Sequence, residues 1–296
     1  MKSIKKIKRT FVIFAFIYLF SVNLFPAEQN KNGEEFKLPI KTSISYETFG
    51  KADFKDTETS LKSRGILFDF DLTFLNLSFS KNYYSWLDAK KTFLTDKPWE
   101  GLTSASLGTG YYQEFSEKLG FLLALSATSN FEKEMKSNSF GYVFLLGGDY
   151  SPNQDIGIFF GGGYSLHPLH NSLFPMIEFS FGDESEPGFS LSLGSELKLR
   201  YRVNKKLLFS TSYGSGGSNY LLADDSKVEE KGYVEFADRY QDISLKYSPK
   251  ENISFTFETA YRFKQEMTIY NNDEDKIASY DIDNVFSSKI VILYNF

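Results

Sequence analysis

Both histidines of the chain lie in one short stretch, His167-Pro-Leu-His170-Asn-Ser172. A serine hydroxyl close to an imidazole is a nucleophile arrangement, provided that a third group orients the ring. Catalytic residue types cluster nowhere else in the sequence. Pro168 and Pro175, however, indicate an irregular loop rather than a strand. The loop interpretation is therefore preferred, and the sequence predicts no enzyme activity.

Charged side chains recur at every second position in two apolar stretches. In 188–203 they lie opposite Leu197 and Leu199, and in 252–266 they lie opposite Phe255 and Phe257. Charge facing lipid at mid-depth costs about 2–4 kcal/mol per Arg or Lys, so these side chains are expected to face a lumen. The candidate lumen-lining residues are Glu196, Lys198, Arg200, Arg202, Glu258, Arg262, Lys264 and Lys289.

Two interpretations of this charged face remain open. In the first, a basic track guides an anionic solute through a channel. In the second, the bases form ion pairs that fill a narrow interior. The acids available for such pairs are Asp69, Asp71, Glu178 and Asp242. Acids and bases are similarly abundant on these faces, which favours the second interpretation.

The sequence has no metal spacing, phosphate loop or dinucleotide fingerprint. The glycine runs 161–163 and 214–217 lie in or beside expected strands, with no helix after them, so they indicate close strand neighbours. Asp53, Asp56, Glu58 and the acidic run 273–275 lack EF-hand spacing and are expected to be solvated loop residues. No cofactor and no metal are predicted.

The elements that must position the charged face are strands of alternating pattern. The last stretch, 284–296, places Phe286, Ile290, Ile292, Tyr294 and Phe296 on one face. Further alternating segments are expected near 40–48, 66–72, 75–86, 102–115, 119–130, 140–150, 156–166, 174–182, 188–203, 206–221, 233–247 and 252–266. Aromatic residues make up 18% of the chain, and after the first 27 residues no apolar run has the length of a spanning helix.

The connections fall into two length classes that alternate along most of the chain. Short ones are expected at 116–118, 151–155, 204–206 and 248–252, and long polar ones at about 50–60, 87–101, 131–139, 222–232 and 267–283. Short turns at one rim and long loops at the other are typical of outer-membrane β-barrels, with periplasmic turns and extracellular loops. A soluble β-sandwich has no reason to sort its loops in this way.

The number of strands is left ambiguous. Thirteen segments are found, but a closed single-chain bacterial barrel needs an even number. The discrepancy lies within 156–203. Either the stretch from Pro168 to Pro175 does not cross the membrane, giving twelve strands, or 188–204 folds back at Gly194-Ser195, giving fourteen.

The first 27 residues are expected to be a signal peptide. Lys2, Lys5, Lys6, Lys8 and Arg9 precede an uncharged run that is short for a membrane span. An uncleaved inner-membrane anchor is the alternative. Removal of these five bases lowers the formal charge from −5 to −10, which argues against nucleic acid as a partner. Residues 28–37 would be a periplasmic segment and 38–296 the barrel. No cysteine is present, so neither a disulfide nor a lipid-modified amino terminus is expected.

The strand that ends Tyr294-Asn-Phe296 resembles the closing strand of bacterial outer-membrane β-barrels. The resemblance implies that the barrel assembly machinery recognises this strand and that outer-membrane lipid surrounds the protein. Trp86, Trp99, Tyr294 and Phe296 are then expected to be aromatic residues at the membrane interface.

Two further resemblances are more local. A loosely defined family of uncharacterised outer-membrane barrels is resembled by the motifs Tyr83-Tyr84-Ser85-Trp86 and Lys97-Pro-Trp-Glu-Gly-Leu102, with the glycine-rich run 147–164 and Pro175. This resemblance implies location and fold but no activity. The spacing His170-x-Ser172 is similar to that of outer-membrane phospholipase A, although its downstream asparagine stretch and its calcium-binding residues have no match here.

The sequence therefore predicts an all-β protein, an antiparallel transmembrane β-barrel of about 12 to 14 strands in an outer membrane. A porin-like channel for small solutes is the preferred function. A surface structural or adhesion barrel acting through its extracellular loops is the alternative, and a phospholipase is a third and weaker one.

Overall fold

The computed structural model describes residues 40–55, 57–72, 74–93 and 95–296. The predicted signal peptide and the periplasmic segment 28–37 lie outside these residues. A four-residue helix, α2 (Lys90–Phe93), and a 3₁₀ turn, η1 (Ser137–Ser139), accompany the strands. The helices that are described are all too short or too polar to cross a membrane. The described strands are β1 (Lys41–Asp53), β2 (Ser60–Leu72), β3 (Leu75–Leu87), β4 (Gly101–Ser116), β5 (Leu119–Phe131), β6 (Phe140–Asn153), β7 (Ile156–Leu166), β8 (Asn171–Phe181), β9 (Gly188–Leu193), β10 (Leu197–Asn204), β11 (Leu207–Leu221), β12 (Tyr233–Lys250), β13 (Ile253–Tyr270), β14 (Lys276–Ile282) and β15 (Val285–Asn295).

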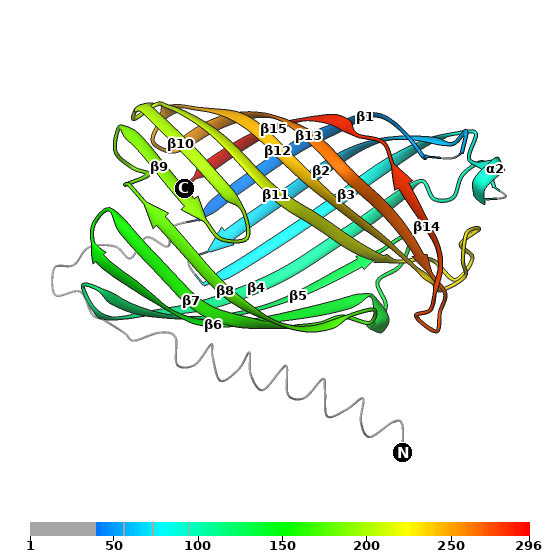
Figure 1. The fold of residues 1–296 in the computed structure, drawn as a ribbon, viewed down its shortest axis with the longest axis horizontal. Helices are drawn as coiled ribbons and strands as arrows, with labels where there is room; N and C mark the ends of the chain where they lie inside the picture. The colour runs from blue at the N-terminus through cyan, green and yellow to red at the C-terminus, as the bar shows by residue number, and fades with distance from the viewer. Residues whose placement is uncertain (1–39, 56, 73, 94) are drawn as a thin grey trace, which may run out of the picture. The chain divides into compact units, whose positions relative to one another are not determined.

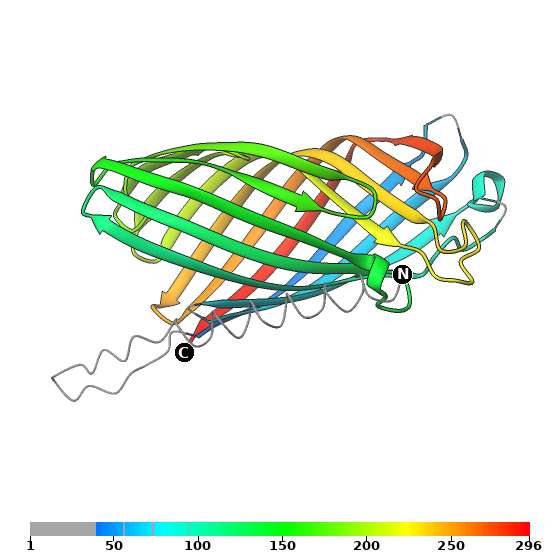
Figure 2. The ribbon, with the colours of Figure 1, turned by 90° about the horizontal axis from the view of Figure 1, so that it is seen from below.

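These strands form one antiparallel sheet that closes on itself, as Figures 1 and 2 show. Closure is made by β1 against β15, in a register that runs from Lys41 opposite Asn295 to Phe49 opposite Ser287. β14 and β15 run in the same direction along different parts of β13, so together they occupy one position in the wall. Among the described residues the barrel therefore has fourteen strand positions. The predicted all-β antiparallel barrel is confirmed.

The stretch 188–204 resolves the ambiguity in the strand number. It forms two strands, β9 and β10, which fold back at 194–196 where the Gly194 N–H donates to the Glu196 carbonyl at 3.0 Å. β8, which contains Pro175, is also part of the wall. The fourteen-strand alternative is thus correct. A single strand over 188–203 is wrong, because the chain reverses in its middle.

The two ends of the barrel differ in the length of their connections. Turns of two residues, such as 117–118 and 205–206, lie at the short-turn end, whereas 88–100, 132–139 and 222–232 lie at the long-loop end. The predicted loop 267–283 is wrong, because most of it is strand: β13 continues to Tyr270, and β14 begins at Lys276. β12 and β13 have 18 residues each, more than the roughly 9–11 that cross a bilayer, so both extend past the membrane.

The outer face of the wall is apolar along neighbouring strands. Ile44 on β1 lies opposite Phe68 on β2 and Ile292 on β15, and all three side chains are exposed. Large contiguous apolar patches are rare on soluble monomers. Here they come from period-two alternation, which places the polar partners of each strand on the inner face. The exposed apolar face is therefore the surface that contacts lipid.

Candidate functional site

Buried apolar side chains fill the inside of the barrel at its long-loop end. They come from strand ends and from the β3–β4 loop, and Phe54, Trp99, Leu102, Val234 and Met267 are each no more than 2% exposed. The rings of Trp86 and Trp99 meet edge to face at a centroid distance of 5.0 Å. We call this set the apolar plug; its buried members are Ala52, Phe54, Leu61, Ala89, Phe93, Trp99, Leu102, Tyr220, Leu222, Val234, Met267, Ile269, Ile282 and Val285.

The two tryptophans differ from their predicted place at the membrane interface. The Trp86 indole N–H donates to the Trp99 carbonyl at 2.9 Å, and Trp99 is 2% exposed. Both rings lie in the apolar plug because alternation on β3 places Trp86 on the same face as Tyr84, away from the exposed Tyr83 and Leu87. Tyr294 and Phe296, by contrast, are exposed, with ring centroids 4.7 Å apart.

A cavity of about 230 Å³ lies next to the apolar plug. Aromatic rings line one part of it, including Phe49, Tyr84 and Phe236. Charged side chains line another part, and these are Glu47, Asp238, Arg262 and Glu266. The Asn82 amide donates to the Tyr220 hydroxyl at 3.4 Å and so links β3 to β11 across the barrel. The interior is therefore narrow at this height, and the cavity combines apolar rings with several polar and charged groups.

Arg262 is the centre of an ion-pair network at this cavity. Its Nη1 lies 2.6 Å from Asp238 Oδ2, and its Nη2 lies 2.9 Å from Glu47 Oε1. The three side chains are 16–22% exposed, and the guanidinium also lies over the Phe49 ring at 4.9 Å. A cation held between two carboxylates with little water around it has a fixed position. This network fixes β1, β12 and β13 relative to one another.

The other predicted lumen-lining residues form separate groups. Lys198 pairs with Glu196 at 3.3 Å, and Glu196 also accepts a hydrogen bond from the Tyr240 hydroxyl at 3.2 Å. Arg200 pairs with Glu184, whose carbonyl oxygen accepts a hydrogen bond from Arg202 Nε at 2.6 Å. Both contacts lie at the short-turn end, in the β8–β9 connection.

Three residues of the predicted set, Glu258, Lys264 and Lys289, lie on β13 and β15, close to the β1–β15 contact that closes the barrel. Lys289 stands directly opposite Glu258 on β13 and Glu47 on β1, so charges of opposite sign alternate along this row. Lys264 is exposed and occupies a β-bulge with φ of 50°, which ends the strict alternation on which its placement depended.

The acids expected to pair with these bases do not do so in the described residues. Asp69 accepts a hydrogen bond from Ser43 at 3.0 Å, and Asp242 accepts one from Ser212. The observed partners are Glu47, Glu184, Glu196 and Asp238 instead. Alternation along β1 and β12 assigns Glu47 and Asp238 to the inner face, but only the register between strands shows which charges meet.

The stretch 167–170 forms the β7–β8 loop, as predicted, but Ser172 and Pro175 lie in β8 and not in the loop. His167 Nδ1 lies 3.3 Å from the Asn219 amide, and His170 Nε2 lies 3.5 Å from Glu235. Burial, and then the nearby His170, lower the pKa of the His167 imidazole. In the described contacts neither imidazole is bonded to Ser172, so the arrangement needed to activate this hydroxyl is not formed.

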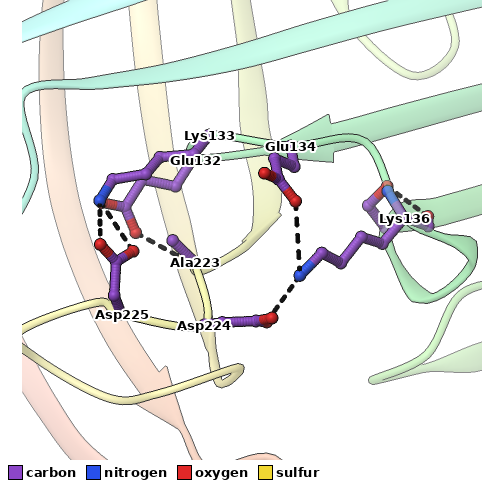
Figure 3. Close-up of polar contacts among 8 residues, drawn as sticks. Glu132, Lys133, Glu134, Lys136, Ala223, Asp224 and Asp225 are labelled. Carbon is purple, nitrogen blue, oxygen red and sulfur yellow. Dashed lines mark hydrogen bonds and ion pairs between the residues drawn. The ribbon is translucent and has the colours of Figure 1, made fainter.

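A set of ion pairs joins two long loops, as Figure 3 shows. Lys133 and Lys136 of the β5–β6 loop lie 2.7 and 2.6 Å from Asp225 and Asp224 of the β11–β12 loop. The Glu132 carboxylate also accepts the Ala223 N–H at 2.9 Å. We call these contacts the loop clasp. Their hydrogen bonds lower the pKa of both aspartates and raise the pKa of both lysines.

The described residues contain no group of three or more His, Cys, Asp or Glu side chains that could hold a metal ion.

No family model and no curated protein matches the sequence. The fold is similar to an outer-membrane channel from Pseudomonas putida F1, at 8% identity over 90% of this chain and 99% of that chain, with a TM-score of 0.45. It is also similar to the NanC porin (9% identity, 86% and 98% covered, TM-score 0.39) and to the translocator domain of the autotransporter NalP from Neisseria meningitidis (13%, 97% and 98%, 0.36). These similarities concern the fold and do not identify a solute for this chain. The closed wall of fourteen positions and its apolar outer face make this chain a transmembrane β-barrel of the outer-membrane type.

Proposed function

We propose that this barrel is an outer-membrane channel for small solutes. The observation that carries the proposal is the charged inner face, which leads to a cavity with both aromatic and ionic lining. An apolar interior would suffice to hold a wall together, whereas charges retained inside a membrane protein mark solute or ion pathways. In this reading the candidate lumen-lining residues set which solutes enter.

The location follows from the same proposal. A signal peptide in residues 1–27 would export the chain, and the strand ending at Phe296 would direct its assembly. The long-loop end would face the outside and the short-turn end the periplasm. The membrane-interface role of Tyr294 and Phe296 is part of this proposal, supported by their exposed rings at the short-turn end.

Conductance of the purified protein in planar bilayers tests the channel. The expected result is discrete steps of small conductance, because the apolar plug narrows the interior at the long-loop end. Protein that migrates as a folded, heat-modifiable barrel on gels, yet neither conducts nor admits small solutes into liposomes, would reject the proposal.

A second candidate is a surface barrel that acts through its loops. The apolar plug and the loop clasp favour it, since both give the long-loop end a fixed shape that a partner could recognise. Binding of cells or matrix by the intact barrel, abolished when 222–232 is shortened, would support this candidate. No hydrolytic function is proposed.

A further inference from the structure

Among the described strands, β8 and β11 each have a long edge without a strand partner. β8 pairs with β9 only through Phe179, Ser180 and Phe181, and β10 stops pairing with β11 at Tyr213. In the described ladder, 171–178 of β8 and 214–220 of β11 therefore lack a neighbour on the sides that face β9 and β10. Figure 1 shows the short β9–β10 hairpin with β8 and β11 continuing past it on either side. We call this interruption the β8–β11 seam.

The residues along the seam are of types that are common on strand edges without a hydrogen-bonded neighbour. Pro175 has no N–H to leave unpaired, and proline is found on edge strands for this reason. β11 has glycine at 214, 216 and 217, so its edge carries few side chains. Leu173 and Ile177 are 82% and 74% exposed, against 50% for Ile44 and 47% for Phe68 on the continuous part of the wall. The larger exposure is what the lack of a neighbouring strand produces.

Contacts at both ends define the length of the seam. At one end Gly194 of the hairpin turn lies against Glu178, so close that an added Cβ would stand 3.2 Å from the Glu178 Cβ. At the other end His167 reaches Asn219 at 3.3 Å. The seam is thus a bounded interruption, held above and below, and not a frayed end of the barrel.

The cavity described above reaches this seam. Gly216 and Gly217, both on the unpartnered edge of β11, are among its lining residues. The apolar plug lies on the path from the cavity to the long loops. A molecule in the cavity therefore has the seam beside it and the apolar plug ahead of it.

We propose that the β8–β11 seam is a lateral passage between the membrane and the cavity, and that its solute is a small amphipathic molecule with one apolar end and one polar end. This inference rests on the proposed channel function. The rings of Phe49, Tyr84 and Phe236 would contact the apolar part of the solute, while Asn82 and Arg262 would receive its polar group. Unpaired backbone groups are tolerated at membrane depth only beside a protein-lined or water-filled space, which this passage supplies.

Labelling of a cysteine in the cavity tests the passage, and the chain has no other cysteine. Ser63→Cys is the reporter, because Ser63 lines the cavity from β2, where both neighbouring strands are paired. N-phenylmaleimide partitioned into proteoliposome bilayers is the apolar probe, and the charged 2-sulfonatoethyl methanethiosulfonate is the aqueous one. Gly217→Phe is designed to narrow the seam by adding a ring to the edge of β11. The substitution fits there, because an added Cβ meets only the Phe236 carbonyl at 3.4 Å. Ala105→Phe, on β4 with strands paired on both sides, is the matched control.

The expected result is that Gly217→Phe slows N-phenylmaleimide labelling several-fold, whereas Ala105→Phe leaves it unchanged. Equal labelling rates in both variants, with heat-modifiable migration retained, would overturn the lateral passage. The channel proposal is judged separately by conductance. Labelling that depends on the seam, in a protein that does not conduct, would support the lateral passage and reject the channel. Conductance without labelling from the bilayer would support the channel and reject the lateral passage.

Discussion

Arg262 on β13 lies 2.9 Å from Glu47 on β1, although 215 positions separate them in the sequence. β15 stands between the two strands, so the contact spans the region where the barrel closes. Asp238 completes the network from the other side at 2.6 Å. The closing region is thus stabilised by charge on the inner face as well as by backbone pairing.

Replacing Arg262 with Met is expected to destabilise the barrel by on the order of 3 kcal/mol, because two largely buried carboxylates lose their cation. The urea midpoint of the heat-modifiable gel band measures this. Adding Glu47→Gln and Asp238→Asn to Arg262→Met should recover much of the loss. A single variant as stable as the parent would show that water already screens the network.

Replacing Trp99 with Ala should lower the free energy of unfolding by about 3–5 kcal/mol, because it leaves a void in the apolar plug. If the apolar plug limits conduction, the same variant should raise single-channel conductance in planar bilayers. Trp99→Phe, which keeps most of the ring volume, is the control and should change both quantities less. If neither variant conducts better than the parent protein, the apolar plug does not limit the flow of ions.

Replacing Lys198, Arg200 and Arg202 together with Gln should shift the reversal potential towards cation preference under a salt gradient. Three positive charges on one inner face lower the barrier for anions, even though Glu184 and Glu196 offset part of their field. If the triple variant conducts with unaltered selectivity, these residues do not form a basic track for anions. They would then be structural ion pairs.

Protease added to intact cells should cut within 222–232 or 271–275 and spare 154–155 and 251–252. The long-loop end is proposed to lie outside, and exposed loop tips are the preferred cleavage sites. Mass spectrometry of the fragments locates the cuts. Cleavage at the two-residue turns would invert the orientation.

The loop clasp should be insensitive to pH over the neutral range and open in acid. The pKa values of Asp224 and Asp225 are lowered from 3.8 by their lysine partners, so the contribution of the loop clasp is complete above that value and is lost as pH falls through the lowered pKa values. A spin label on Lys227→Cys should keep its mobility from pH 8 to pH 5 and gain mobility only below pH 3.8. Asp225→Asn should loosen the label at every pH. Gradual loosening between pH 7 and pH 5 would assign the effect to His167 instead.

Much of the wall could be predicted from alternation alone, because lipid on one side and polar groups on the other impose period two on every strand. The sequence does not decide whether the chain reverses at Gly194, because a six-residue strand such as β9 has too few alternating positions to be recognised. The place of Trp99 could not be predicted either. A tryptophan in a loop looks the same in sequence whether the loop faces lipid or folds into the barrel, and only the packing with Trp86 decides.

The register that pairs Lys41 with Asn295 also bears on how the barrel folds. Most other neighbours in the wall are consecutive strands, whose pairing closes only short loops of chain. The β1–β15 contact must instead gather a chain of more than 250 positions, and loop-closure entropy makes such contacts slow. A sheet with both edges exposed is therefore expected to persist until the two terminal strands meet. In the described wall the β8–β11 seam keeps two unpaired strand edges after this step, so that part of the finished barrel retains a feature of the open sheet.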